Sequence, residues 1–122
     1  MKKLFSLLLA AASLVGCQSN TAFKSVDAQQ FAEVIANKDV QLVDARTPEE
    51  FSEGHIPGAV NIDVKSENFD AQIATLNPAR PVAVYCRSGR RSKLAAERMT
   101  NAGLQVTELA EGILSWKGEV VK

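Results

Sequence analysis

Hydrophobic and polar positions follow two alternating periods along residues 23–122. Short apolar runs rich in β-branched residues alternate with segments whose apolar residues recur at helical spacing. We expect strands at 23–26, 40–44, 60–62, 81–85 and 105–109. The run at 81–85 is continuously apolar, as is typical of a strand buried on both faces. The alternation predicts an α/β fold: a small domain with a mostly parallel five-stranded sheet and helices on both faces.

The helical segments carry their own start signals. We expect helices at 27–37, from 47 onward, at 69–76, at 92–103 and at 113–116. Asp27 can cap the first of these helices. Thr47 followed by Glu50 is the pattern of a capping box. Glu49, Glu50 and Glu53 are typical of a solvated helix face near a helix N-terminus, where negative charge is favourable.

The first 22 residues have a different pattern. Two lysines precede an apolar run over 4–15, which is shorter than the roughly 20 residues that a membrane span needs. This predicts a signal peptide over 1–16, a polar tether over 17–22 and one domain over 23–122. Residues 14–17 (Leu-Val-Gly-Cys) resemble the bacterial lipobox, which implies that Cys17 is a lipid attachment site. The protein would then be an exported lipoprotein on the periplasmic side of a bacterial membrane, with the outer membrane favoured by Gln18. A soluble exported protein is the alternative.

Composition excludes several classes of function. The chain has 122 residues, of which 46% are hydrophobic and 23% are charged, which is ordinary for one globular domain. Fourteen basic and fourteen acidic residues cancel, so we expect no nucleic-acid partner, which would need a basic excess. One His and two Cys cannot form a four-ligand Cys/His zinc site.

Cysteine usage points to one residue. If Cys17 carries lipid, Cys86 is the remaining thiol in an oxidising compartment, and no intrachain disulfide can form. Cys86 is then either an inert buried residue or a thiol whose chemistry is used.

The segment around Cys86 indicates that this cysteine is reactive rather than inert. It reads Cys86-Arg87-Ser88-Gly89-Arg90-Arg91-Ser92. It follows the central apolar strand and precedes a helix, at the sheet edge where open α/β folds bind ligands. Backbone amides turned inward and a helix N-terminus add positive potential, and three arginines lie within six residues. These features favour the thiolate and an anionic substrate. A solvated basic loop around a buried cysteine is the alternative.

Four motifs in order carry a family resemblance. They are Val43-Asp44-Ala45-Arg46, then residues 53–61 (Glu-Gly-His-Ile-Pro-Gly-Ala-Val-Asn), then the Cys86 segment, then Glu111-Gly112 with Trp116. The chain resembles a single-domain rhodanese, a thiosulfate sulfurtransferase. The resemblance implies that Cys86 is the catalytic residue and that Arg87, Ser88, Gly89, Arg90, Arg91 and Ser92 bind the substrate. It implies neither a metal nor another cofactor.

The implied reaction moves a sulfane sulfur through a Cys86 persulfide. The donor is a small anion, thiosulfate, because cationic loops accompany it in this family, and the product is sulfite. Cyanide or a thiol is the acceptor. A cysteine phosphatase would need Arg six positions after the cysteine, where this chain has Ser92. A carrier or oxyanion-binding module that works with a partner protein remains the second hypothesis. His55 belongs to a turn and is expected to be structural.

Overall fold

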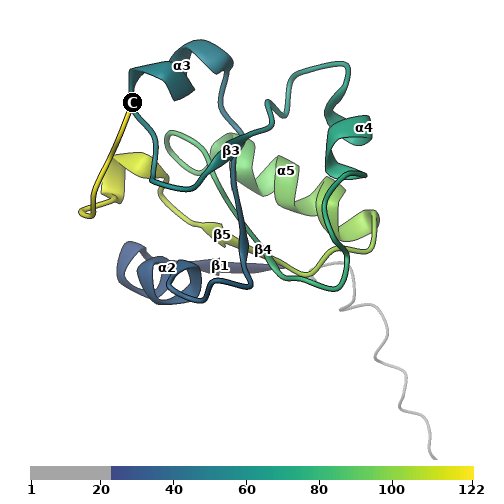
Figure 1. The fold of residues 1–122 in the computed structure, drawn as a ribbon, viewed down its shortest axis with the longest axis horizontal. Coiled ribbons are helices and arrows are strands. Elements are labelled where there is room, and N and C mark those ends of the chain that lie inside the picture. Colours follow the sequence, from purple (N-terminus) through teal and green to yellow (C-terminus); the bar gives the residue numbers. More distant parts are fainter. Residues whose placement is uncertain (1–22) are drawn as a thin grey trace, which may run out of the picture.

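A computed structural model describes residues 23–122, whose five strands form one sheet (Figure 1). The strand order is β1 (Lys24–Val26), β5 (Val106–Leu109), β4 (Val82–Tyr85), β2 (Gln41–Asp44) and β3 (Val60–Asn61). Every neighbouring pair is parallel. The predicted α/β fold is therefore confirmed. The expected signal peptide and tether lie outside the described residues.

Helices cover both faces of this sheet. They are α2 (Ala28–Ile35), α3 (Pro48–Glu53), α4 (Phe69–Ile73), α5 (Arg90–Asn101) and the 3₁₀ turn η3 (Ile113–Ser115). Helices α4 and α5 pack on one face, around Phe69 and Met99. Helix α2 and the segment after η3 pack on the other face, around Phe31, Tyr85 and Leu109. Fully burying each such side chain stabilises the fold by about 1.5–3 kcal/mol. In the part of the chain that the structure describes, no helix is long and apolar enough to cross a membrane.

The element boundaries differ from expectation most at α5. This helix begins at Arg90, two residues before the expected start at Ser92. Gly89 adopts a left-handed backbone with φ 101°, which glycine reaches without a steric penalty, and the helix can begin directly after it. The Ser92 hydroxyl is therefore not a cap, and Arg90 and Arg91 lie in the first helical turn. Helices α2 and α4 also end earlier than expected, at Ile35 and Ile73.

The chain order places the end of β4 at a special position. From β2 the chain passes through α3 to β3 on one side, and from β4 it passes through α5 to β5 on the other. The connections that leave neighbouring strands β2 and β4 thus diverge. Open α/β sheets bind ligands at such a switch point, beyond the carboxyl ends of the strands. Cys86 is the first residue after β4 and lies at this point.

Candidate active site

The Cys86 sulfur sits inside a ring of backbone amides. Its Sγ accepts hydrogen bonds from the amide of Gly89 at 3.1 Å and from the amide of Ser92 at 3.2 Å. The residue is only 1% exposed, so water screens these bonds little. Amide donors aimed at a sulfur favour its negatively charged form. The site therefore suits a thiolate or a charged sulfur attached to it.

Two carbonyl groups of the loop accept hydrogen bonds from η3. The carbonyl of Cys86 accepts from the amide of Ile113 at 2.9 Å, and that of Arg87 accepts from Leu114 at 3.2 Å. Gly112 makes the close approach possible, because a Cβ there would lie 2.1 Å from the Arg87 carbonyl oxygen.

Four more loop amides are available to an anion. Within residues 23–122 they have no protein acceptor, and they belong to Arg87, Ser88, Arg90 and Arg91. Together with the two amides on Sγ, each of the six residues after Cys86 carries an N–H group that either donates to the sulfur or has no protein acceptor within residues 23–122. The loop can thus bind negative charge with backbone alone, in the manner of an anion-binding nest.

Arg91 is held by an acidic partner. Its guanidinium donates to both carboxylate oxygens of Glu50, at 2.7 and 2.9 Å, which joins α5 to α3 across the switch point. The hydrogen bond from Arg91, with smaller contributions from Thr47, lowers the pKa of Glu50 to about 2, and the bond to Glu50 raises the pKa of Arg91. The helix pattern predicted that Glu50 belongs to a solvated face. The ion pair with Arg91 shows that this prediction is wrong for Glu50. It caps α3 with Thr47 and fixes Arg91 at the rim of the loop.

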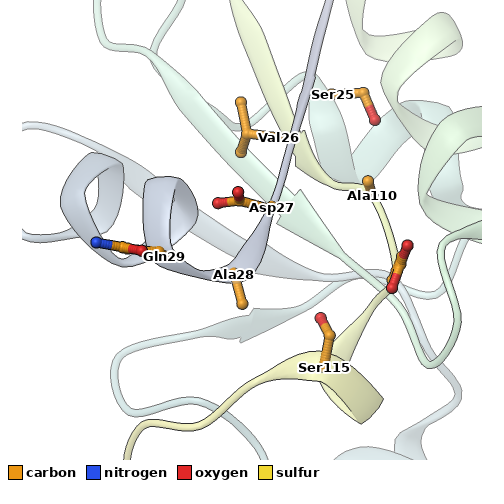
Figure 2. A pocket seen from close by; sticks show the side chains of 8 residues that line it. Ser25, Val26, Asp27, Ala28, Gln29, Ala110 and Ser115 are labelled. Atoms are coloured by element: carbon orange, nitrogen blue, oxygen red, sulfur yellow. The ribbon is translucent and has the colours of Figure 1, made fainter.

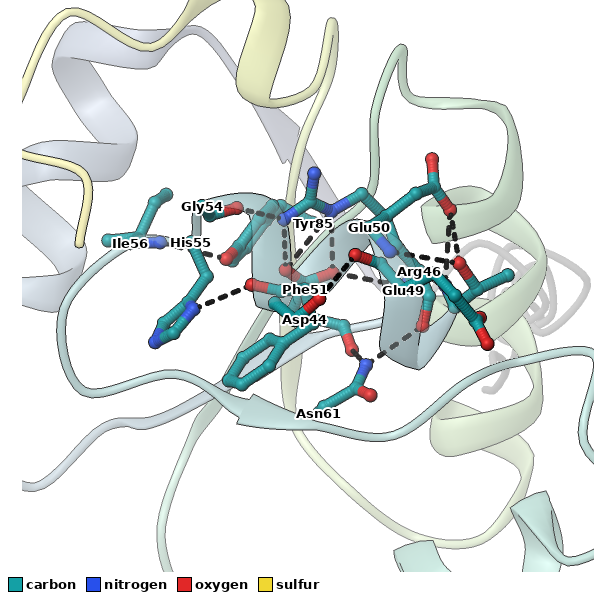
Figure 3. A network of polar contacts seen from close by, with 12 residues as sticks. Asp44, Arg46, Glu49, Glu50, Phe51, Gly54, His55, Ile56, Asn61 and Tyr85 are labelled. Carbon is teal, nitrogen blue, oxygen red and sulfur yellow. Dashed lines mark hydrogen bonds and ion pairs between the residues drawn. The ribbon is translucent and has the colours of Figure 1, made fainter. Parts of the chain in front are cut away.

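A buried ion pair supports the neighbouring strand end (Figure 3). Asp44 is fully buried and lies 2.6 Å from the guanidinium of Arg46, which also donates to the carbonyl of Gly54 at 2.7 Å. Burial lowers the pKa of Arg46, but the hydrogen bond and charge of Asp44 outweigh burial and raise it overall. The pair ties the end of β2 to the end of α3 and leaves neither charge free for a ligand.

His55 belongs to the same frame. Its ring stacks on Phe51 with 3.7 Å between centroids, and Nδ1 lies 2.9 Å from the Phe51 carbonyl. Its backbone pairs with Val121. The amide of the next residue, Ile56, donates to the Tyr85 hydroxyl at 3.0 Å, as Figure 3 shows. These contacts give His55 the structural role that its turn had indicated.

A basic pocket of about 490 Å³ opens beside the loop. It is lined by Lys65, Ser88, Arg90, Arg91 and Leu94. Among the described residues, neither Lys65 nor Arg90 forms an ion pair. Arg87 is exposed outside this pocket. Sequence reasoning missed Lys65. The available signal was its place after β3, at the same sheet edge as Cys86.

No residue cluster suited to a metal ion is found in the described part of the chain, where groups of three or more His, Cys, Asp or Glu are absent. The donors that the site does offer are amides, guanidinium groups and one ammonium. Such a set binds anions rather than cations.

Known proteins that are similar to this chain match it within the described residues. The family of the rhodanese-like domain matches residues 27–119. A thiosulfate sulfurtransferase (GlpE) of Shewanella oneidensis is 33% identical over 97 residues, which cover 79% of this chain and 94% of that protein. A putative sulfur carrier protein (YrkF) of Bacillus subtilis is 31% identical over 87 residues, covering 70% of this chain and 46% of the relative. The crystal structure of a rhodanese-related protein from Thermoplasma volcanium superimposes with a TM-score of 0.72 at 30% identity, over 80% of this chain and 97% of that one.

Proposed function

The chain belongs to the rhodanese-like family, and from this premise we propose that it is a thiosulfate sulfurtransferase with Cys86 as its sulfur carrier. One observation carries the proposal: two backbone amides donate to the buried Cys86 Sγ, and four further amides of the same loop have no protein acceptor within residues 23–122. That arrangement stabilises both the nucleophile and the charged intermediate.

In the first half-reaction the Cys86 thiolate attacks the outer sulfur of thiosulfate. A bond forms between Sγ and that sulfur, and the bond from that sulfur to the sulfonate sulfur breaks. The departing sulfite takes the electron pair of the broken bond, so the enzyme keeps a negatively charged persulfide. No proton moves in this step, because the attacking species is the thiolate.

In the second half-reaction an acceptor removes the sulfur. Cyanide or a thiolate attacks the terminal sulfur of the persulfide, and the electron pair of the broken S–S bond returns to Cys86 Sγ. With cyanide the product is thiocyanate. The amides of Gly89 and Ser92 stabilise Cys86 as a leaving group just as they stabilise it as a nucleophile.

The cations of the pocket attract the donor and stabilise sulfite. Arg90 and Lys65, which are free of acidic partners within residues 23–122, face the open pocket beside the loop. Arg87 adds exposed positive charge on the same loop, outside the pocket. Arg91 contributes a fixed guanidinium that Glu50 orients. Thiosulfate is small, whereas the pocket has a volume of about 490 Å³, which also leaves room for an organic thiol acceptor.

Cys86→Ser tests the proposal. The parent protein should form thiocyanate from thiosulfate and cyanide, and its intact mass should rise by one sulfur after thiosulfate treatment alone. Cys86→Ser should do neither, whereas Cys17→Ser should do both. Turnover by Cys86→Ser, or hydrolysis of p-nitrophenyl phosphate by a parent that ignores thiosulfate, would contradict the proposal.

A sulfur carrier without turnover is the second candidate. It is favoured by the likeness to a protein named as a putative sulfur carrier and by the 1% exposure of Cys86. A persulfide that forms stoichiometrically but passes to no small acceptor would favour this function over the first.

We also propose that the domain is exported and anchored through lipid on Cys17. The apolar run at 4–15 and the lipobox-like residues 14–17 support this. Labelled fatty acid should enter the protein in bacterial cells, and Cys17→Ser should abolish the labelling.

A further inference from the structure

A buried carboxylate lies behind the Cys86 loop and has no part in the reaction as written above. Glu108 in β5 is fully buried. Its Oε1 accepts from the Ser92 hydroxyl at 2.7 Å, and its Oε2 lies 3.2 Å from Lys93 Nζ and accepts from the Ser25 hydroxyl. An interior carboxylate with this many partners is strongly fixed, because an unpaired charge there would be costly.

One partner of Glu108, Ser92, also donates a hydrogen bond to the Cys86 sulfur. Ser92 holds Glu108 through its side chain and donates its backbone amide to Cys86 Sγ at 3.2 Å. The carboxylate therefore fixes the side chain of the same residue whose amide binds the sulfur.

A second partner of Glu108, the charged residue Lys93, contacts Gly89, whose amide is the other donor to the sulfur. Lys93 Nζ donates to the carbonyl of Ala110 at 2.9 Å and to the carbonyl of Gly89 at 3.3 Å, besides its ion pair with Glu108. It thus fastens Gly89, whose amide is the other donor to Cys86 Sγ. A Cβ on Gly89 would lie 1.9 Å from the Ala110 carbonyl oxygen, so the two segments are already in close contact.

The outer side of this network borders a pocket of about 390 Å³. Figure 2 shows Ser25 and Ala110 near one another in its wall. Ser25 donates to the Glu108 carboxylate, and the Ala110 carbonyl accepts from the Lys93 ammonium. The network therefore spans from this wall to the sulfur.

We propose that Glu108 is a positioning residue for sulfur transfer: through Ser92 and Lys93, its carboxylate holds in place the two backbone amides that bind the Cys86 sulfur. The proposal rests on the proposed function for its turnover measurements. Donor binding is assigned to Lys65, Arg90 and the other loop cations, which Glu108 does not contact. Loss of Glu108 should therefore lower kcat and kcat/KM by the same factor and leave KM unchanged.

The test uses Glu108→Gln and Ser92→Ala, each made with Cys17→Ser so that Cys86 is the only thiol. Glutamine keeps the shape of Glu108 and loses its charge. Alanine at 92 keeps the backbone amide and removes the hydroxyl, which donates to Glu108 at 2.7 Å and lies 3.2 Å from the Gly89 carbonyl. The matched controls lie on the same helix: Thr100→Val removes a buried hydroxyl without a hydrogen-bond partner within residues 23–122, and Glu97→Gln removes an exposed carboxylate.

Two rates are measured: alkylation of Cys86 by iodoacetamide, which needs no turnover, and sulfur transfer from thiosulfate to cyanide. We expect both to fall about tenfold in Glu108→Gln and in Ser92→Ala, as for a weakened hydrogen bond to a charged group. The double variant should be no slower than Glu108→Gln, because Ser92→Ala breaks a link that Glu108→Gln has already weakened. The controls should match the parent.

Other results would overturn the proposal. Faster alkylation in Glu108→Gln would mean that the carboxylate acts on Cys86 only through its negative charge, which disfavours a thiolate, and does not position the amides. A raised KM with unchanged kcat would place Glu108 in donor binding, and parental rates in both variants would give it no role. If Glu108→Gln does not fold by circular dichroism, Ser92→Ala decides alone, since it keeps the Glu108–Lys93 pair. A parent that is alkylated but transfers no sulfur would refute the proposed function, and the alkylation rates would still test Glu108.

Discussion

The bond between Glu50 and Arg91 offers a sharp test of how the loop is held, by Glu50→Gln. Glutamine at this position preserves the capping box of α3, which accepts either Glu or Gln. It removes the negative charge that faces Arg91 at 2.7 and 2.9 Å. The change therefore isolates the ion pair from the helix cap.

The magnitude follows from the pKa of Glu50. It falls from the ordinary 4.5 to about 2 in the folded protein, which corresponds to at most about 3 kcal/mol of stability at neutral pH. The two side chains are 20% and 27% exposed, and solvent screening reduces the contribution to about 1–2 kcal/mol. Because the folded pKa is depressed, this stability is complete above pH 4.5 and is lost as the pH falls through about 2.

Urea unfolding at several pH values measures the effect. Glu50→Gln should be less stable than the parent by about 1–2 kcal/mol at pH 7, with Tm lower by roughly 4–16 °C. The difference should shrink between pH 4.5 and 2. Glu49→Gln is the matched control, because Glu49 is exposed on the same helix and forms no ion pair within residues 23–122. Equal midpoints for Glu50→Gln and the parent at pH 7, or a difference that persists at pH 2, would refute the reasoning.

Two further predictions concern the loop and its pocket. Gly112→Ala should cost at least about 2 kcal/mol and most of the activity, because its Cβ would strike the Arg87 carbonyl at 2.1 Å. Gly103→Ala, which meets no atom within 4 Å despite its positive φ, should cost only ~1 kcal/mol; equal losses in urea unfolding would contradict the packing argument. Lys65→Ala should raise KM for thiosulfate roughly threefold to fivefold at low salt and leave kcat unchanged. Lys38→Ala, on an exposed turn elsewhere, should not change KM, and identical steady-state kinetics for the two variants would exclude Lys65 from donor binding.

The sequence alone determined the class of fold and the place of its chemistry. Strand-length apolar runs alternate with helical periods, and this alternation leaves few arrangements other than a parallel sheet covered by helices. The continuous apolar run at 81–85 predicted the central strand, which the structure has at Val82–Tyr85. Cys86 follows it directly, so its position at the carboxyl edge of the sheet could be inferred without coordinates.

Only the tertiary structure decided which charges near Cys86 are free. Arg90 and Arg91 are neighbours in sequence and line the same pocket, yet Arg90 has no ion-pair partner within residues 23–122, whereas Arg91 is bound by Glu50, 41 residues away. Likewise, Glu108 in a short strand gives no local sign that it fastens Ser92 and Lys93. Local patterns report propensity and periodicity, which depend on near neighbours. Pairing and burial of a charge depend on long-range contacts that exist only once the chain has folded.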